Sequence, residues 1–370
     1  MGVFYRADVL GSLLRPQYLK DARKAREAGT IDAAEFKRIE DRAVDQAIAL
    51  QEATGVDVVA DGEMRRSHFI APLTDVLEGV APIPAFKRQW RRRARADEQP
   101  KEIDIQVQYA VVGKISLKRS LATEEFIYAR ARARKPVKIA LPSPLMMTLR
   151  WSPEHSKNAY PDPFELFRDA ADLVRREAQE LATLGCKYIQ IDAPEFGMLC
   201  DPARRKADFA DLGMDPDRLL TEGMDIINSV ASVPGVTFGL HFCRGNNEGY
   251  YVGEGGYESI SAKAFKHISN YELLLLEYDD WRSGSFEPLR DIPDDKRVVL
   301  GLISSKLPVM EPVEDLIARI DEASRHFPRE QLGLSTQCGF ASVMAGNPIT
   351  EAAQEAKLRL VAEVARRVWG

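Results

Sequence analysis

The chain of 370 residues has few cysteines, little net charge and no long apolar run. Its four cysteines, Cys186, Cys200, Cys243 and Cys338, are too few and too scattered for a disulfide framework, so we expect free thiols or metal ligands. No stretch approaches the roughly 18 uncharged apolar residues of a membrane span, and the first residues do not resemble a secretory signal. The formal net charge of -5 argues against nucleic acid as the main partner. We therefore expect a cytoplasmic protein that binds neither membranes nor nucleic acid.

Short apolar runs alternate with long amphipathic ones, which is typical of parallel strands joined by helices. Eight such units without a linker predict a single (β/α)8 TIM-barrel catalytic domain over residues 1–370, and a doubly wound open sheet is the alternative. The expected helices are Asp32–Thr54, Pro163–Leu184, Val313–His326 and Ile349–Trp369. The expected strands are Asp8–Leu10, Val56–Ala60, Val137–Leu141, Tyr188–Ile191, Val236–Leu240, Leu273–Leu276, Val298–Leu302 and Leu332–Leu334.

One region interrupts this alternation after the second expected strand. We interpret residues 79–134 as an insertion with a hairpin over Ile103–Val112 and a helix. Its basic run, Phe86–Arg95, has two interpretations. It is either a solvated face of the insertion or a lid that attracts an anionic substrate, such as a polyglutamate tail or a sulfonate.

A candidate metal site follows from the ends of three expected strands. His241 and Cys243 are two residues apart, so on a strand they point to the same side, as two ligands of one metal must. Glu277 ends another apolar run, and Cys338 follows the last expected strand. A lone cysteine in an apolar segment is more often a core residue than a ligand. The carboxyl ends of barrel strands share one rim, however, so the four side chains predict a His/Cys/Glu/Cys zinc site.

Other residues at the same expected rim complete a motif pattern. The motifs are Gly11-Ser12, Asp61-Gly-Glu63 with Arg66, Ile189-Gln-Ile-Asp192 followed by Pro194, His241-x-Cys243, Glu277 and Cys338-Gly339. This series resembles the catalytic domain of cobalamin-independent methionine synthase over nearly the whole chain, in the single-domain branch that also includes epoxyalkane:coenzyme M transferase. The resemblance implies a TIM barrel with zinc held by His241, Cys243, Glu277 and Cys338.

The resemblance also implies roles for residues that do not bind the metal. Ser12, Glu63 and Asp192 would hold the amino acid part of homocysteine, and Arg66 is a further candidate for substrate binding. Trp151 lies in Thr148–Ser152, which resembles a segment near the folate pocket, although it could equally pack under the insertion.

Zinc suits a reaction in which the substrate supplies the nucleophile. A thiol with a pKa of roughly 8.5 is mostly protonated at neutral pH, and coordination to zinc releases the proton. The expected activity is therefore transfer of an alkyl group to a zinc-activated thiol, with no nucleophile from the protein. The expected partners are a small thiol, an alkyl donor and, as a hypothesis, a second copy of the chain.

Departures from the family pattern keep the substrates open. An alanine, Ala193, follows Asp192 where the family has a glutamate, and Ile303–Lys306 lacks the family's histidine, which is thought to deliver a proton to the folate. The N-terminal half of the longer enzymes, which contributes to folate binding, is also missing.

Three functional hypotheses remain. The first is methyl transfer to homocysteine from a folate, a corrinoid protein or a small methylated compound. The second is alkylation of coenzyme M by an epoxide, and the third is zinc or thiol binding without turnover. Coenzyme M would need a cation for its sulfonate, and the candidates are Arg15, Arg66, Arg244 and Lys306.

Overall fold

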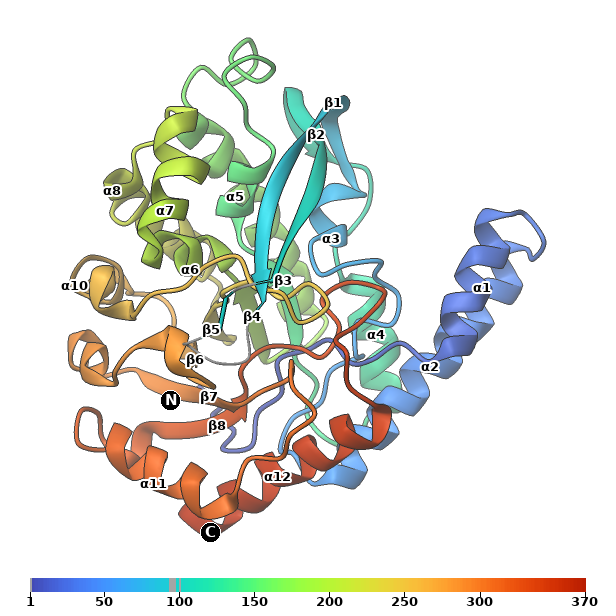
Figure 1. Ribbon diagram of the computed structural model, residues 1–370. Coiled ribbons are helices and arrows are strands. Elements are labelled where there is room, and N and C mark those ends of the chain that lie inside the picture. The colour runs from blue at the N-terminus through green and yellow to red at the C-terminus, as the bar shows by residue number, and fades with distance from the viewer. Residues whose placement is uncertain (1, 93–97, 100) are drawn as a thin grey trace.

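A parallel six-stranded sheet forms the centre of this α/β fold. The computed structural model describes residues 2–92, 98, 99 and 101–370, except the side chains of 72, 74, 85–88, 92 and 105–108. Neighbouring strands follow the order of the chain, and helices connect them around the sheet (Figure 1). Every crossover therefore places the carboxyl ends of the strands at one edge. The strands are β3 (Ile139–Pro142), β4 (Tyr188–Asp192), β5 (Thr237–Phe242), β6 (Leu273–Glu277), β7 (Arg297–Ile303) and β8 (Leu332–Thr336).

The first two expected strands, Asp8–Leu10 and Val56–Ala60, are not strands in the structure. Ala7, just before the first, forms a single parallel bridge with Leu334, and Val59, within the second, forms one with Val137. The carboxylate of Asp57 accepts hydrogen bonds from the backbone N–H groups of Arg6 and Ala7, both at 2.9 Å, and so replaces the backbone acceptors of a longer ladder. Asp57 N–H in turn donates to Ala7 O at 2.9 Å, which keeps the two segments adjacent.

The expected long helices are present with small shifts at their ends. Asp32 accepts from the N–H of Glu35 and begins α2, while Gly55, with φ of 91°, ends it in the left-handed conformation that glycine favours. Thr350 caps α12 in the same way through the N–H of Ala353. The helices are α1 (Gln17–Glu27), α2 (Ala33–Thr54), α3 (Ala71–Thr74), α4 (Thr123–Arg132), α5 (Pro163–Thr183), α6 (Pro194–Cys200), α7 (Pro202–Arg204), α8 (Pro216–Leu219), α9 (Glu222–Val230), α10 (Ser261–Ala264), α11 (Val313–Ala323) and α12 (Glu351–Trp369).

The insertion contains a longer hairpin than Ile103–Val112. Strands β1 (Leu77–Arg92) and β2 (Lys101–Leu117) pair antiparallel, and α4 follows them. Residues 86–92 of the basic run thus form part of β1, and the charged residues obscured the apolar alternation that identifies a strand. Residues 93–95 lie outside the described part of the chain. Most side chains of Phe86–Arg95 lie outside the described residues. In Figure 1 the hairpin rises beside β3, β4 and β5.

Hydrogen bonds fix the hairpin to loops beyond the strand ends. Arg91 and Tyr251 exchange two backbone hydrogen bonds of 2.8 and 2.7 Å, and the Arg91 guanidinium pairs with Asp201 and, at 3.5 Å, with Glu254. On the other strand, Val111 N–H donates to Arg150 O at 2.8 Å. The hairpin is therefore attached to loops after both β3 and β5.

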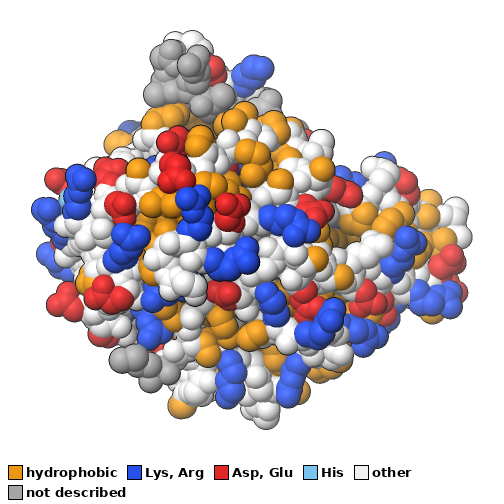
Figure 2. Space-filling model, turned by 90° about the horizontal axis from the view of Figure 1, so that it is seen from below, with side chains coloured by type: hydrophobic (Ala, Val, Ile, Leu, Met, Phe, Trp, Pro, Cys, Tyr) orange, Lys and Arg blue, Asp and Glu red, His pale blue; other side chains and the backbone are white. Residues whose placement is uncertain are grey.

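The surface carries both signs of charge. Lys and Arg side chains are interspersed with Asp and Glu over the face shown in Figure 2. The formal charge of -5 is therefore not gathered into one acidic patch on that face. Among the described residues, no helix combines the length and apolar character needed to cross a membrane.

Candidate metal centre

Four predicted ligands meet at the carboxyl ends of β5, β6 and β8. His241 lies in β5 and Cys243 follows its last residue, Glu277 ends β6, and Cys338 comes two residues after β8. One ligand atom from each lies within 4.8 Å of the others, and all four residues are buried. Segments up to 97 residues apart in the sequence, His241 to Cys338, are therefore brought within the span of one metal ion.

Two buried atoms at this site have no hydrogen-bond partner among the described residues. They are Nε2 of His241 and Oε2 of Glu277, and His241 Nε2 lies 3.8 Å from Glu277 Oε1. Burying unpaired polar atoms is costly, and a cation between them would satisfy both. Imidazole, carboxylate and thiolate groups are the usual ligands of zinc, so the donor set fits that ion.

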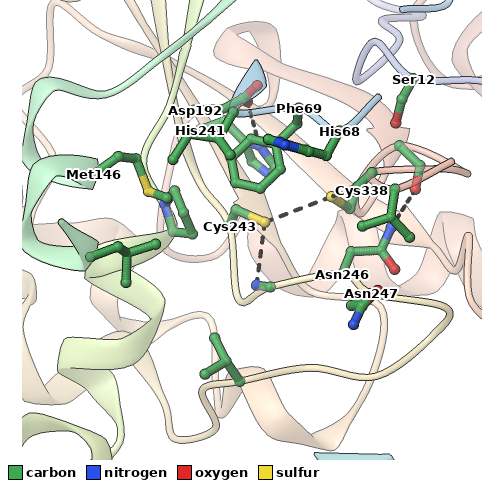
Figure 3. Close-up of a pocket in the computed structure, with 18 of the residues that line it drawn as sticks. Ser12, His68, Phe69, Met146, Asp192, His241, Cys243, Asn246, Asn247 and Cys338 are labelled. Atoms are coloured by element: carbon green, nitrogen blue, oxygen red, sulfur yellow. Dashed lines mark hydrogen bonds and ion pairs between the residues drawn. The ribbon is translucent and has the colours of Figure 1, made fainter. Parts of the chain in front are cut away.

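The two cysteines of the cluster lie within hydrogen-bond distance of each other. Cys243 Sγ lies 3.7 Å from Cys338 Sγ and also accepts a hydrogen bond of 3.3 Å from the N–H of Gly245 (Figure 3). The hydrogen bond between the thiols raises the pKa of Cys243 and lowers the pKa of Cys338. A thiolate is thus favoured at one cysteine, and a coordinated metal would deprotonate both.

Asp192 orients the histidine of the cluster. It ends β4, is the register partner of His241 in β5, and places Oδ1 2.9 Å from His241 Nδ1. Burial alone would lower the pKa of His241, but the hydrogen bond and the charge of Asp192 outweigh it and leave that pKa raised. With Nδ1 bonded to Asp192, Nε2 faces Glu277, which is the arrangement that prepares a histidine to bind a metal.

A pocket of about 380 Å³ adjoins the cluster. His241, Cys243 and Cys338 line it, together with Asp192, Ser12 and Glu63. Figure 3 shows Asp192, His68 and Phe69 gathered beside His241, with Asn246 and Asn247 beyond the two cysteines. A small molecule in this pocket would therefore have direct access to a metal held by the cluster.

Ser12 and Glu63 line the pocket through unusual backbone geometry. Ser12 packs directly against Gly339. A side chain at residue 339 would exclude it, because a Cβ there would lie 2.0 Å from Ser12 Oγ. Glu63 has φ of 54°, which is strained for a residue with a side chain. Its burial raises the pKa of the carboxyl to about 7 despite the nearby Arg66 and Arg15. A positively charged substrate group would favour the carboxylate form.

Two predicted substrate-binding residues do not line the pocket. Arg66 donates to both carboxylate oxygens of Glu125 and lies 3.7 Å from Glu63, so its guanidinium is engaged by carboxylates of the protein. Trp151 is buried in the core, where its indole N–H donates to Tyr160 O at 3.1 Å.

The remaining cysteines lie elsewhere in the core. Cys186 is buried before β4, as its apolar setting predicts. Cys200 ends α6 and is also buried.

Sequence reasoning did not select several pocket residues. Asn246 and Asn247 follow the His241-x-Cys243 motif, and their closeness to Cys243 in the sequence could have identified them. Trp90 and Tyr109 come from the hairpin, and no local pattern indicated that it would cover the pocket.

Ala193 stands where the family has a glutamate, and the next carboxyl group along the chain is that of Glu195. Glu195, in the first turn of α6, is fully buried and accepts a hydrogen bond from the hydroxyl of Ser143. Burial raises its pKa to about 8, so it is mainly neutral at pH 7. It is not among the residues that line the pocket, and its position indicates a role within the core.

Comparisons with known proteins show similar sequences and a similar fold. The chain is 36% identical to YxjH of Bacillus subtilis (strain 168), an uncharacterized protein, over 371 residues that cover 99% of this chain and 95% of the other. It is 25% identical to a methionine synthase of Pyrococcus abyssi over 90% of this chain and 85% of that protein. A crystal structure described as a putative vitamin-B12 independent methionine synthase from Listeria monocytogenes superposes with a TM-score of 0.74 at 28% identity and covers 100% of this chain and 99% of the other.

A family model extends over almost the entire chain. The model described as "Cobalamin-independent synthase, Catalytic domain" matches residues 7–367, a range that includes every member of the metal cluster. The chain therefore belongs to the cobalamin-independent methionine synthase family, in the form of its catalytic domain.

Proposed function

We propose that this protein is a zinc-dependent methyltransferase that converts homocysteine to methionine. The observation that carries the proposal is the buried cluster of His241, Cys243, Glu277 and Cys338 beside a pocket in a chain of this family. Zinc, when bound there, supplies a Lewis acid that lowers the pKa of a thiol at neutral pH. A TIM-barrel type of domain over residues 1–370, in which the bridges of Ala7 and Val59 extend the six-stranded sheet and residues 79–134 are an insertion, is part of the same proposal.

The residues around the cluster would bind and orient the amino acid. Asp192 has one oxygen, Oδ1, bonded to His241 and to the side-chain amide of Gln190, at 2.9 and 2.6 Å. Its other oxygen, Oδ2, is left for the ammonium group of the substrate, with Glu63 as a second carboxylate in the same pocket. The hydroxyl of Ser12 would accept or donate a hydrogen bond at the carboxylate end of the substrate.

Coenzyme M is less well supported as the thiol. The cations considered for its sulfonate, Arg15, Arg66, Arg244 and Lys306, do not line the pocket. Arg15 and Arg244 donate to backbone carbonyls, for example to Glu63 O and Gly255 O, and Lys306 lies 3.8 Å from Glu277. Carboxylates facing the pocket instead favour a substrate with an ammonium group.

Metal analysis followed by a thiol assay tests the proposal. The purified protein should contain one zinc per chain, and homocysteine should give methionine when a suitable methyl donor is present. Thiol binding can be measured without a donor, by the appearance of a sulfur neighbour at the zinc absorption edge. A protein without stoichiometric zinc, or with a zinc shell that homocysteine never changes, would contradict the proposal.

A further inference from the structure

The part of the pocket beyond the substrate-binding carboxylates is apolar and aromatic. Phe69, Trp90 and Tyr109 line it, and the aliphatic and thioether side chains there are Ile70, Met146, Leu149, Met198, Val252 and Val343. Trp90 and Tyr109 come from opposite strands of the hairpin, which the Arg91 and Val111 hydrogen bonds fix to the loops. The hairpin therefore forms one wall of a chamber for the second substrate.

The chamber is small. Its volume of about 380 Å³ includes the space needed by the thiol substrate. Pockets for small molecules span roughly 300–1,000 Å³, so this one is near the lower limit. A donor with an extended body would have to project out of the pocket past the hairpin.

The aromatic side chains of the described lining favour a cationic donor. The carboxylates there, Glu63 and Asp192, are assigned to the ammonium of the thiol, and the lining also contains the guanidinium of Arg150. His68 also lines the pocket, but burial lowers its pKa, so it is mainly neutral at pH 7. Aromatic faces attract quaternary ammonium and related cations, with tryptophan the most effective.

The described lining offers little to protonate a leaving group. His241, Cys243 and Cys338 belong to the metal cluster, and Asp192 is bonded to His241. Glu63 would be held as a carboxylate by the substrate ammonium. A donor whose leaving group departs as a neutral molecule needs no acid from the protein.

We propose that the pocket takes a small onium compound, a sulfonium or quaternary ammonium ion, as its methyl donor. This inference rests on the proposed function and names the class of its second substrate. The thiolate sulfur forms a bond to the methyl carbon as the bond from that carbon to the onium atom breaks. The electron pair stays on the departing sulfur or nitrogen, which leaves as a neutral thioether or amine, and no proton is consumed.

The apolar wall fits this reaction for an electrostatic reason. A thiolate and an onium ion carry opposite charges that cancel as the methyl group moves. Water stabilises the separated charges more than the transition state, so a pocket that excludes water favours the transfer. A folate donor would instead need an acid in the pocket, because its leaving nitrogen must be protonated.

Trimethylsulfonium and a tryptophan variant test the inference on the zinc-loaded protein. With homocysteine, trimethylsulfonium should give methionine and dimethyl sulfide in equal amounts, faster than the triglutamate of 5-methyltetrahydrofolate gives methionine. Trp90→Ala should lower kcat/KM for trimethylsulfonium by roughly tenfold, whereas Trp90→Phe, which keeps an aromatic face, should retain most of it. Trp281→Ala is the matched control, because Trp281 is on the surface and does not line the pocket.

A cation and a neutral molecule of similar size give a second readout, which tests recognition of the positive charge. Tetramethylammonium, whose methyl group moves more slowly because an amine leaves less readily than a thioether, should weaken trimethylsulfonium turnover competitively, and the neutral tert-butyl alcohol should not. Preference for the folate, no dimethyl sulfide, or equal effects of Trp90→Ala and Trp281→Ala would overturn the inference. If homocysteine still adds sulfur to the zinc shell in that case, the proposed function stands and only the donor class fails.

Discussion

Asp192 Oδ1 lies 2.9 Å from Nδ1 of His241, at the register pair that joins β4 to β5. The same carboxylate faces the pocket, so one side chain connects the metal ligand with the expected position of the substrate ammonium. Changes at Asp192 should therefore alter metal affinity as well as thiol binding.

Asp192→Ala should weaken zinc binding by roughly 10- to 100-fold, because outer partners of metal-binding histidines have effects of this size. Asp192→Asn should lose less zinc, since the amide oxygen can still accept from Nδ1–H, but it should bind homocysteine more weakly for lack of the charge. Competition with a zinc chelator measures the first effect and thiol titration the second. Unchanged zinc affinity in Asp192→Ala would contradict the orienting role.

Cys243→Ser and Cys338→Ser should each lose far more zinc than the Asp192 variants, because they remove a ligand of the cluster. Cys186→Ala and Cys200→Ala are matched controls, since both cysteines are buried outside the site. The controls should keep stoichiometric zinc and most activity, with a modest loss of thermal stability for the cavities they leave. Metal analysis of the four proteins decides the assignment, and zinc that is equally low in all four would argue against it.

Glu195 should make the stability of the fold depend on pH. Its folded-state pKa is raised from 4.5 to about 8, so the folded chain binds more protons than the unfolded chain between these values. Stability should accordingly fall as pH rises through this window, by about 1.4 kcal/mol per unit of pKa shift at most. Glu195→Gln should remove this dependence and become more stable than wild type at pH 9. Chemical denaturation at pH 5, 7 and 9 provides the measurement, and parallel pH profiles would exclude the effect.

Arg91 should affect binding of the methyl donor more than binding of the thiol. Its backbone and guanidinium attach the hairpin to Tyr251, Asp201 and Glu254. Arg91→Ala should raise KM for the methyl donor several-fold and leave zinc content and homocysteine binding close to wild type. Arg367→Ala serves as the control, because its ion pair with Glu314 is exposed and joins α12 to α11. An equal rise in KM for both substrates would contradict a role limited to the hairpin wall.

The sequence was most informative where local pattern and chemistry coincide. Six of the expected strands and the four long helices are present because their apolar periodicity reflects burial on a sheet face or a helix stripe. The cluster of His241, Cys243, Glu277 and Cys338 was also predictable, since each residue follows an apolar run at the expected rim.

Features set by long-range contacts could not be predicted in this way. The segments near Ala7 and Val59 are shortened to bridges by Asp57, a contact that no local pattern encodes. Trp90 and Tyr109 reach the pocket only because β1 and β2 extend and attach to distant loops. Arg66 matches a family motif, but its partner Glu125 lies 59 residues away and directs it out of the pocket.

X-ray absorption at the zinc edge tests the central claim most directly. In the resting protein we expect two sulfur neighbours, from Cys243 and Cys338, with nitrogen and oxygen from His241 and Glu277. Homocysteine should add a further sulfur neighbour in wild type and require higher concentrations to do so in Asp192→Asn. A zinc shell that stays the same with homocysteine but gains sulfur from mercaptoethanesulfonate would contradict the homocysteine assignment and favour coenzyme M.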